Sequence, residues 1–402
     1  MPETPPLKKA LQIGSVCIFT YITSYFLRNL LSVLTPRMLN SNAYTEEFLA
    51  LLASLYMIVY AAGQLVNGVI GDHLKPKHMV SGGLTVAAIG LLIFYFSRIE
   101  VLGIIAFALL GFGLSSLRGP LVKVISENTL PKYARVCCVF LSFSSFAGPL
   151  LAGLAGMLWD WKEVFLISAL ITLAIAVLSF LSLTWFEKRN MILPIHAVRE
   201  SAAPRKKLDL LGLFRLPNFV LYMIVGMVVE IAAASINFWM PTYFNQYLQI
   251  SETSSTLLFS IISLLRSFCP FLSLLIFKLF RERDVLIVRI AFSAAAVLFA
   301  IQFLVKEPVL NVLLFTLALM CSSVSSATLW SIYIPSLGKS GKVSSANGVL
   351  DCTGYVAAAL LNLAIVPIMN FGGWGGVILS WCTIMLIGAL ATLFAKKRTC
   401  ES

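Results

Sequence analysis

Residues 164–184 read VFLISALITLAIAVLSFLSLT, an apolar stretch without a single charged side chain. About 20 apolar residues are enough for an α-helix to cross the hydrocarbon core of a bilayer. Similar stretches, separated by short polar breaks, recur along the whole chain, which is 59% hydrophobic and only 12% charged. A soluble domain carries about twice that share of charged residues. The sequence therefore predicts a polytopic membrane protein.

The apolar stretches predict twelve transmembrane helices. The expected spans are residues 11–34, 46–70, 78–97, 101–126, 134–158, 163–187, 217–241, 254–279, 284–304, 309–335, 342–369 and 374–395. The one long polar insert, 188–216, falls between the sixth and seventh spans. We therefore expect an all-α membrane protein with an N-terminal six-helix bundle (1–187), a cytoplasmic linker (188–216) and a C-terminal six-helix bundle (217–402).

The basic residues predict the orientation. If successive breaks lie on alternate sides of the membrane, 21 of the 30 Lys and Arg residues fall on one side. They are Lys8, Lys9, Lys75, Lys77, Lys132, Arg135, the seven of the linker, Lys278, Arg281, Arg283, Lys339, Lys342, Lys396, Lys397 and Arg398. Only Arg37, Arg98, Lys162 and Lys306 fall on the other side. Basic loops stay in the cytoplasm, so both termini are expected there. The net charge of +12 is thus mostly a topology signal, and no nucleic-acid partner is expected.

An internal repeat indicates two related halves. The sequence LTPRML (34–39) follows the first span, and WMPTYF (239–244) follows the seventh at the same place. Basic segments likewise follow the second span (GDHLKPK, 71–77) and the eighth (KLFRERD, 278–284). Two parallel six-helix repeats with a long linker resemble the plan of the major facilitator superfamily, which implies pseudo-symmetric bundles and a substrate site near the membrane midplane.

Ionisable side chains inside the spans are candidate functional residues, because a buried charge costs about 2.5–3.5 kcal/mol even on insertion scales. Six are singled out: Arg28, Arg118, Lys123, Glu230, Arg266 and Asp351. Arg28 follows Tyr25 by three residues and Tyr21 by seven, which places a guanidinium and two phenols on one helical face. This set suits a carboxylate or phosphate. The alternative is a structural arginine that pairs with Glu230 or Asp351.

The other intramembrane charges leave more than one interpretation open. Arg118 precedes Gly119-Pro120, which permits a kink, and it either lines a cavity or forms a structural ion pair. Lys123 is expected to extend to the cytoplasmic interface. Glu230, with Asn237 on one side of the same span, is either a proton-coupling group or the partner of Arg266.

Two further sets are predicted near the cytoplasmic side. Asp351, with Asn347 and Tyr355 at a spacing of four, lies about two turns from the cytoplasm and could anchor a gate. Gly68 and Asp72 belong to a loop pattern that closes the cytoplasmic side in the superfamily, so we expect them to act in gating.

Several motifs in the same order resemble the organophosphate:phosphate antiporter family, which exchanges glycerol 3-phosphate or hexose phosphates for phosphate. They are Tyr21, Tyr25 and Arg28; Tyr60 followed by Gly68 and Asp72; Gly119-Pro120 with Lys123; Asp160-Trp161; Trp239-Met240-Pro241-Thr242-Tyr243; and Asn347-Gly348 with Gly354-Tyr355. The helical spacing and the resemblance together give the candidate substrate contacts, which are Arg28, Tyr21, Tyr25, Tyr60, Gln64, Arg118, Asn237 and Tyr355.

Departures from that family bear on the substrate. Its second arginine, in the seventh span, aligns with Ala233, because Ala233 precedes Pro241 by eight residues as Arg28 precedes Pro36. Its basic residue in the second span is Gln64 here, and its histidine in the fifth span is nearer Ser145. The remaining set suits a substrate with less negative charge than a phosphate dianion: a carboxylate, a phosphodiester or a zwitterion.

The leading hypothesis is a secondary transporter that moves a small organic anion (organophosphate, carboxylate or zwitterion) across the inner or plasma membrane, by exchange or by ion coupling. One alternative is a proton-coupled symporter that uses Glu230 and Asp351. Another is a ligand sensor on a transport fold. An enzyme is not expected, since His73, His78 and His196 all fall in cytoplasmic breaks. We expect a monomer in the lipid bilayer, with no cofactor and no metal site.

The charge asymmetry predicts that both termini and residues 188–216 are cytoplasmic. In a cysteine-free background, Ser201→Cys should resist a membrane-impermeant thiol reagent in intact cells and react once the cells are permeabilised. Asn42→Cys, in a loop expected outside, should react at once. Labelling of Ser201→Cys in intact cells would overturn the topology.

Overall fold

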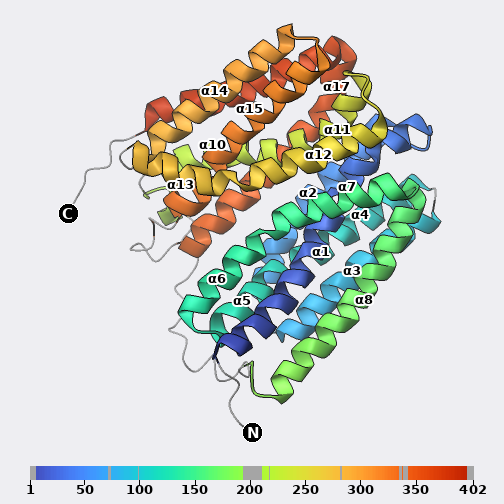
Figure 1. Cartoon of the computed structure of the whole chain (residues 1–402), viewed down its shortest axis with the longest axis vertical. Coiled ribbons are helices and arrows are strands. Elements are labelled where there is room, and N and C mark those ends of the chain that lie inside the picture. Colours follow the sequence, from blue (N-terminus) through green and yellow to red (C-terminus); the bar gives the residue numbers. More distant parts are fainter. Residues whose placement is uncertain are drawn as a thin grey trace. The chain divides into compact units, whose positions relative to one another are not determined.

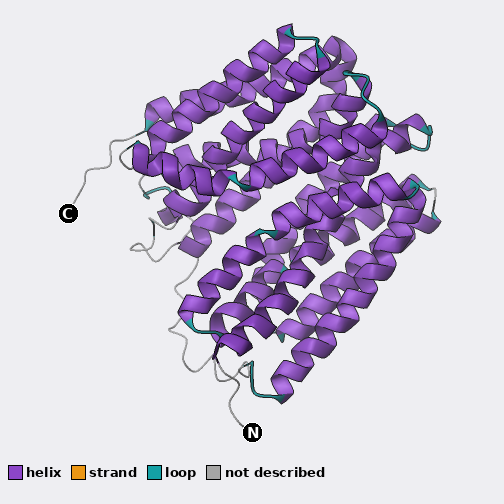
Figure 2. Ribbon diagram, viewed as in Figure 1, coloured by secondary structure: helices purple, strands orange, loops and turns teal. Residues whose placement is uncertain are grey.

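The computed structural model describes residues 6–70, 74–97, 99–192, 211–216, 218–280, 283–334, 337 and 343–395. Helices make up nearly all of this part of the chain, and it contains no strand (Figures 1 and 2). Many large apolar side chains are exposed, among them Leu170, Val177, Leu178 and Leu181 along one helix. A water-facing surface would not carry so continuous an apolar face, whereas lipid tails are its natural solvent.

The chain groups into two compact units, residues 1–41 with 55–205 and residues 42–54 with 206–402. The helices from the first part of the chain are α1 (Pro6–Asn40), α2 (Glu46–Ile70), α3 (Pro76–Phe96), α4 (Glu100–Ser115), α5 (Arg118–Asn128), α6 (Pro131–Ser142), α7 (Ser144–Leu158) and α8 (Trp161–Lys188). Here α3 packs against α4 and α8, and α1 packs against α7 (Figure 1).

The second unit holds the remaining helices. They are η1 (Leu211–Leu213), α10 (Phe219–Glu230), the π-helix η2 (Ile231–Ile236), α11 (Asn237–Gln246), α12 (Glu252–Ser267), α13 (Cys269–Leu279), α14 (Asp284–Leu304), α15 (Pro308–Thr328), the π-helix η3 (Leu329–Tyr333), α17 (Val343–Ala391) and η5 (Thr392–Phe394). Here α17 packs against α10 and α14, and α14 also packs against α15.

The twelve predicted spans are confirmed. Ten helices in the described part are long and apolar enough to cross a membrane. The predicted fifth span corresponds to α6 and α7 together, which meet at Phe143. The eleventh and twelfth spans are joined in α17, where Gly373 has φ 57° and ψ −162° and breaks the helix between them. Glycine adopts this conformation without the steric penalty of a side chain.

Two spans are interrupted near a proline. The predicted fourth span is broken at Ser116 and Leu117, between α4 and α5, and the eighth is broken at Phe268, between α12 and α13. Pro120 and Pro270 follow these breaks closely. A proline ring clashes with the carbonyl four residues before it and donates no hydrogen bond, so each break has a direct steric cause.

The first part of α2 belongs to the second unit, whereas the rest of α2 belongs to the first. The fully buried Asn362 of α17 donates from Nδ2 to the Ala50 carbonyl oxygen (3.1 Å) and to Ser54 Oγ (3.2 Å). Gln246 of α11 donates from Nε2 to Glu46 Oε1 at 2.7 Å. These hydrogen bonds fasten the start of α2 to α11 and α17. The predicted domain boundaries at residues 187 and 217 divide the chain by sequence position, whereas the compact units also divide α2. These boundaries stay a prediction.

Asn362→Leu should detach residues 42–54 from α17, because the leucine cannot donate to Ala50 or Ser54 and each lost buried hydrogen bond costs about 1–3 kcal/mol. Hydrogen–deuterium exchange should become faster in 42–54 and stay unchanged in 55–67. Asn128→Leu is the matched control, since Asn128 lies on α5 and its amide donates to the Val124 carbonyl of its own helix. Unchanged exchange in 42–54 of the Asn362→Leu protein would contradict this account.

Candidate functional site

Arg28 lies among tyrosines from α1 and α2. Its guanidinium carbon is 4.6 Å from the ring centroid of Tyr60 and 5.3 Å from that of Tyr25. The rings of Tyr21 and Tyr25 meet edge to face at 5.4 Å. Tyr21 and Tyr60 are buried, with 5% and 3% of their surface exposed, whereas Arg28 and Tyr25 are only half-buried. The cation therefore keeps an accessible edge within a wall of phenols.

Local packing fixes this arrangement. Tyr56 and Tyr60 are one turn apart on α2 and stack with ring centroids 5.8 Å apart, and Tyr56 acts electrostatically on Arg28. On the other side, α7 approaches α1 at Gly148, where a Cβ atom would collide with Tyr25. Only glycine allows this approach, so Gly148 sets the position of Tyr25. Sequence reasoning missed Tyr56, although its spacing of four from Tyr60 was a usable signal.

Arg118 and Gln64 are also in the first unit. Arg118 is the first residue of α5 and is exposed. The positive charges of Arg118 and Arg28 both act electrostatically at Tyr21. Gln64 is half-buried, one turn after Tyr60 on α2. Lys123, by contrast, is half-buried and interacts with Glu127, one turn farther along α5.

The predicted gating residues are not placed by the structure. Asp72 lies outside the described residues. Gly68 belongs to the last turn of α2, but its surroundings also lie outside the described part. The gating role of both residues stays a prediction.

Arg266 is the centre of a polar cluster in the second unit. It donates from Nη1 to Asn237 Oδ1 and from Nε to Ser323 Oγ, both at 3.0 Å. Glu230 interacts with Arg266 electrostatically and is buried, with 8% of its surface exposed. The structure thus brings together Glu230, Asn237 and Arg266, which the sequence had singled out separately. Ser323, on α15, was not singled out.

A π-helix shapes this cluster. It covers residues 231–236, directly between Glu230 and Asn237. A π-turn holds one residue more than an α-turn, so the count of eight residues back from Pro241 no longer matches the count from Pro36 to Arg28. The position equivalent to Arg28 moves from Ala233 to Ala232. Both residues are alanine, so the conclusion that no arginine stands there is unchanged.

Asp351 and Tyr355 lie one turn apart on α17, and both are buried. Between them, Gly354 faces Glu230 so closely that a Cβ atom would lie 2.5 Å from the Glu230 Cγ. A larger residue at 354 would therefore push Glu230 out of place. This part of α17 is therefore next to Glu230, and the expected roles of Asp351 in coupling or in a gate and of Tyr355 as a substrate contact stay predictions.

One intramembrane arginine was missed. Arg289, within the predicted ninth span, donates from Nε to Thr392 Oγ1 at 3.0 Å and from Nη2 to the Thr392 carbonyl at 2.8 Å. Arg289 therefore supplies a hydrogen-bond donor to a carbonyl at the end of the last span, where helix carbonyls have no partner within the helix. This is a structural role.

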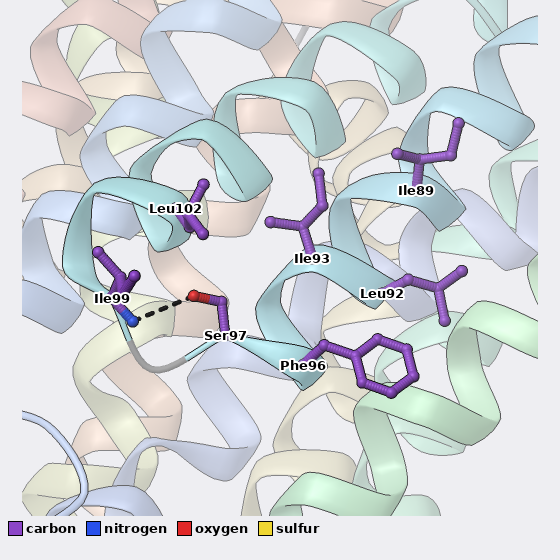
Figure 3. A pocket seen from close by; sticks show the side chains of 7 residues that line it. All are labelled: Ile89, Leu92, Ile93, Phe96, Ser97, Ile99 and Leu102. Atoms are coloured by element: carbon purple, nitrogen blue, oxygen red, sulfur yellow. Dashed lines mark hydrogen bonds between the residues drawn. The ribbon is translucent and has the colours of Figure 1, made fainter.

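An apolar pocket lies at the ends of α3 and α4 (Figure 3). It is lined by Ile89, Leu92, Ile93, Phe96, Ser97, Ile99 and Leu102. Ser97 Oγ accepts a hydrogen bond from the Ile99 backbone N–H at 3.1 Å. The described residues of the lining are otherwise apolar. Among the described residues, no cluster of His, Cys, Asp and Glu could hold a metal ion.

The profile of the Major Facilitator Superfamily matches residues 17–361. The chain therefore belongs to this superfamily of secondary transporters, which work by alternating access. It is a multi-pass membrane protein, and membership of a transporter family confirms the expectation that it is not an enzyme.

Solved structures share the fold. The crystal structure of a D-xylose-proton symporter has a TM-score of 0.71 and 15% identity, covering 96% of this chain and 97% of that one. A bacterial homologue of the human lysosomal transporter Spinster, in an inward-facing and occupied conformation, has a TM-score of 0.77 and 12% identity, covering 98% and 97%. At these identities the likeness shows the fold alone. Comparison with curated protein sequences gave no match.

Arg266 and Glu230 should behave as a coupled pair. Arg266→Met should destabilise the protein, because it removes the donor to Asn237 and Ser323 and a positive charge that acts on the buried Glu230. Glu230→Gln in the same protein should restore most of the loss. The measurement is a double-mutant cycle on thermal unfolding in detergent, with Arg289→Met combined with Glu230→Gln as the control pair. Strictly additive effects of Arg266→Met and Glu230→Gln would refute the coupling.

Proposed function

We propose that this chain is a secondary transporter of a small organic anion and that Arg28 is its main anion-binding residue. The observation that carries the proposal is the position of the half-buried Arg28, with its guanidinium beside the phenol rings of Tyr25 and Tyr60. A guanidinium offers several N–H donors in one plane, which match the oxygens of a carboxylate or phosphate.

The position of Arg28 supports this role. Arg28 lies deep in the span formed by α1. Exposure of a guanidinium to lipid tails at that depth is costly, so its accessible edge belongs to a hydrated space inside the protein. The phenols add hydroxyl groups that can hydrogen-bond to substrate oxygens. Tyr21, Tyr25, Tyr60 and Gln64 are therefore proposed as supporting substrate contacts.

Some positions of the candidate site hold other residues than in the organophosphate:phosphate antiporters. For this reason the proposed substrate class stays broad. No arginine stands at Ala232 or Ala233, the helix positions that the resemblance assigns to a second cation. The resemblance itself rests on the order of short motifs. An organophosphate, a carboxylate and a zwitterion with an exposed acidic group all fit a site whose main cation is Arg28.

A second candidate is proton-coupled symport. Glu230 and Asp351 are buried carboxyls, with 8% and 7% of their surface exposed, and Glu230 interacts with Arg266. A carboxyl that takes up and releases a proton beside an arginine can change the partner of that arginine during a transport cycle. In proton-coupled symport, unlike exchange, the substrate moves together with protons. Uptake of the substrate should therefore respond to an imposed pH gradient.

Arg28→Ala should abolish uptake of the anion and weaken its binding by about 2–5 kcal/mol, because the substrate charge loses its buried partner. Arg28→Lys should be partly active, since it keeps the charge and loses the planar fork. Binding is measured as a ligand-induced rise in the unfolding temperature of purified protein, across phosphorylated, carboxylated and zwitterionic metabolites. Arg189→Ala is the control, because Arg189 is exposed and stacks on Trp185 at 4.2 Å, at the end of α8.

Near-normal ligand binding by Arg28→Ala would move the anion site elsewhere. A variant that fails to fold, and that Glu230→Gln rescues, would make Arg28 a structural arginine instead.

A further inference from the structure

The buried amide of Asn362 joins three helices of the second unit. Asn362, on α17, is fully buried. Its Nδ2 donates to the Ala50 carbonyl oxygen and to Ser54 Oγ of α2, at 3.1 and 3.2 Å. Its Oδ1 accepts from Ser235 Oγ, in the π-helix η2, at 3.4 Å. Both polar atoms of one side chain are therefore bound to other helices.

The hydrogen bonds to α2 lie where this helix passes from one compact unit into the other. Residues 42–54 belong to the second unit, and Leu55 begins the part of α2 that belongs to the first. No glycine or proline lies between Glu46 and Ala62, so α2 lacks the usual cause of a kink at this point. Alternating access moves one helix bundle against the other. A straight α2 follows only one of them, and its attachment to the other has to be released.

The attachments of α2 in the two units differ in kind. In the first unit, α4 approaches α2 at Gly111, where a Cβ atom would lie 2.8 Å from the Tyr56 carbonyl oxygen. Nearby, Asn67 donates to Ser115 Oγ at 2.7 Å. Backbones packed this closely cannot separate without leaving a void. The attachment in the second unit includes hydrogen bonds from side chains, which water replaces at a small net cost. The attachment at Asn362 is therefore the one that is suited to release.

We propose that Asn362 is a positioning residue of the transport cycle: it holds the start of α2 in the conformation of this structure and releases it in the opposite conformation. Release admits water to the Asn362 amide, because a buried amide without a partner is costly. The loop before α2 is on the side that the charge pattern assigns to the outside, so release opens the protein toward that side. This inference rests on alternating access and not on the substrate, and it is independent of the anion site.

The test uses Asn362→Asp, which keeps the shape of the side chain. The carboxylate still accepts from Ser235, but it has no N–H to donate to Ala50 and Ser54. It should therefore disfavour the conformation in which this side chain is buried and not the one in which it is hydrated. Single cysteines are introduced into a cysteine-free protein, which is purified in detergent. Their reaction rates with a water-soluble thiol reagent report on the two conformations.

The two reporters are Val366→Cys and Gly348→Cys, both on α17. Val366 follows Asn362 by one turn on the same face and is 2% exposed. Gly348 lies about 21 Å before Asn362 along the helix axis, and a Cβ atom there would meet no atom within 4 Å. Asn362→Asp should raise the rate at Val366→Cys by about tenfold or more, which corresponds to 1.4 kcal/mol. It should lower the rate at Gly348→Cys, because one side closes as the other opens.

Asn128→Asp is the matched control and should change neither rate, since Asn128 is also buried and its amide donates to the Val124 carbonyl within α5. Ser54→Ala removes one of the two acceptors on α2, so it should shift both rates in the same directions as Asn362→Asp. It serves as the test if Asn362→Asp does not fold. An asparagine with a merely structural role would lower the unfolding temperature without moving the two rates in opposite directions. If neither Asn362→Asp nor Ser54→Ala moves them in opposite directions, the proposal is overturned.

Discussion

The structure depends above all on the absence of hydrogen-bond partners in the hydrocarbon core of a bilayer. A backbone N–H or carbonyl that meets lipid without a partner costs several kcal/mol, so a chain that crosses repeatedly must be helical. Departures from the α-helix are then costly unless other groups satisfy the backbone. In the described part they occur at Ser116 and Leu117, at Phe143, in the π-helices 231–236 and 329–333, at Phe268 and at Gly373. Three of these six places adjoin candidate site residues closely, since Arg118 follows one break, Glu230 and Asn237 flank the first π-helix, and Arg266 precedes Phe268 by two residues.

The same constraint explains which polar side chains the interior contains. Buried serines and threonines commonly donate to a carbonyl about one turn back, as Thr35 does to Leu31 and Ser54 to Ala50. Such hydroxyl groups form their hydrogen bond within their own helix and need no partner from a neighbouring helix. Longer polar side chains reach between helices, as Asn67 and Arg266 do. The polar groups that join helices therefore mark the places where helix positions are fixed most firmly.

Much of the fold follows from local pattern. Charge-free apolar stretches locate the spans, and helical spacing alone places Tyr21, Tyr25 and Arg28 on one face, as the structure has them. Pro120 signals the break in the fourth span. By contrast, the segment IAAASI (231–236) contains neither proline nor glycine, so no local signal distinguishes its π-helix from an α-helix. The bond from Asn362 to Ser54 joins residues 308 positions apart, which no periodicity encodes. The bond from Arg289 to Thr392 joins residues 103 positions apart and is likewise not encoded by any local pattern.

Helix α2 carries both the tyrosines that border Arg28 and the residues that are hydrogen-bonded to Asn362 near the end of the chain. No glycine or proline interrupts it between Glu46 and Ala62, so this stretch is expected to bend little. Asn362 donates hydrogen bonds to Ala50 and Ser54 of this helix. Tyr56 and Tyr60, which border Arg28, lie within two turns of these bonds. From Ser54 to Tyr60 the distance along the helix axis is only about 9 Å. The residues that Asn362 holds and the tyrosines that border Arg28 are therefore parts of one continuous stretch of helix.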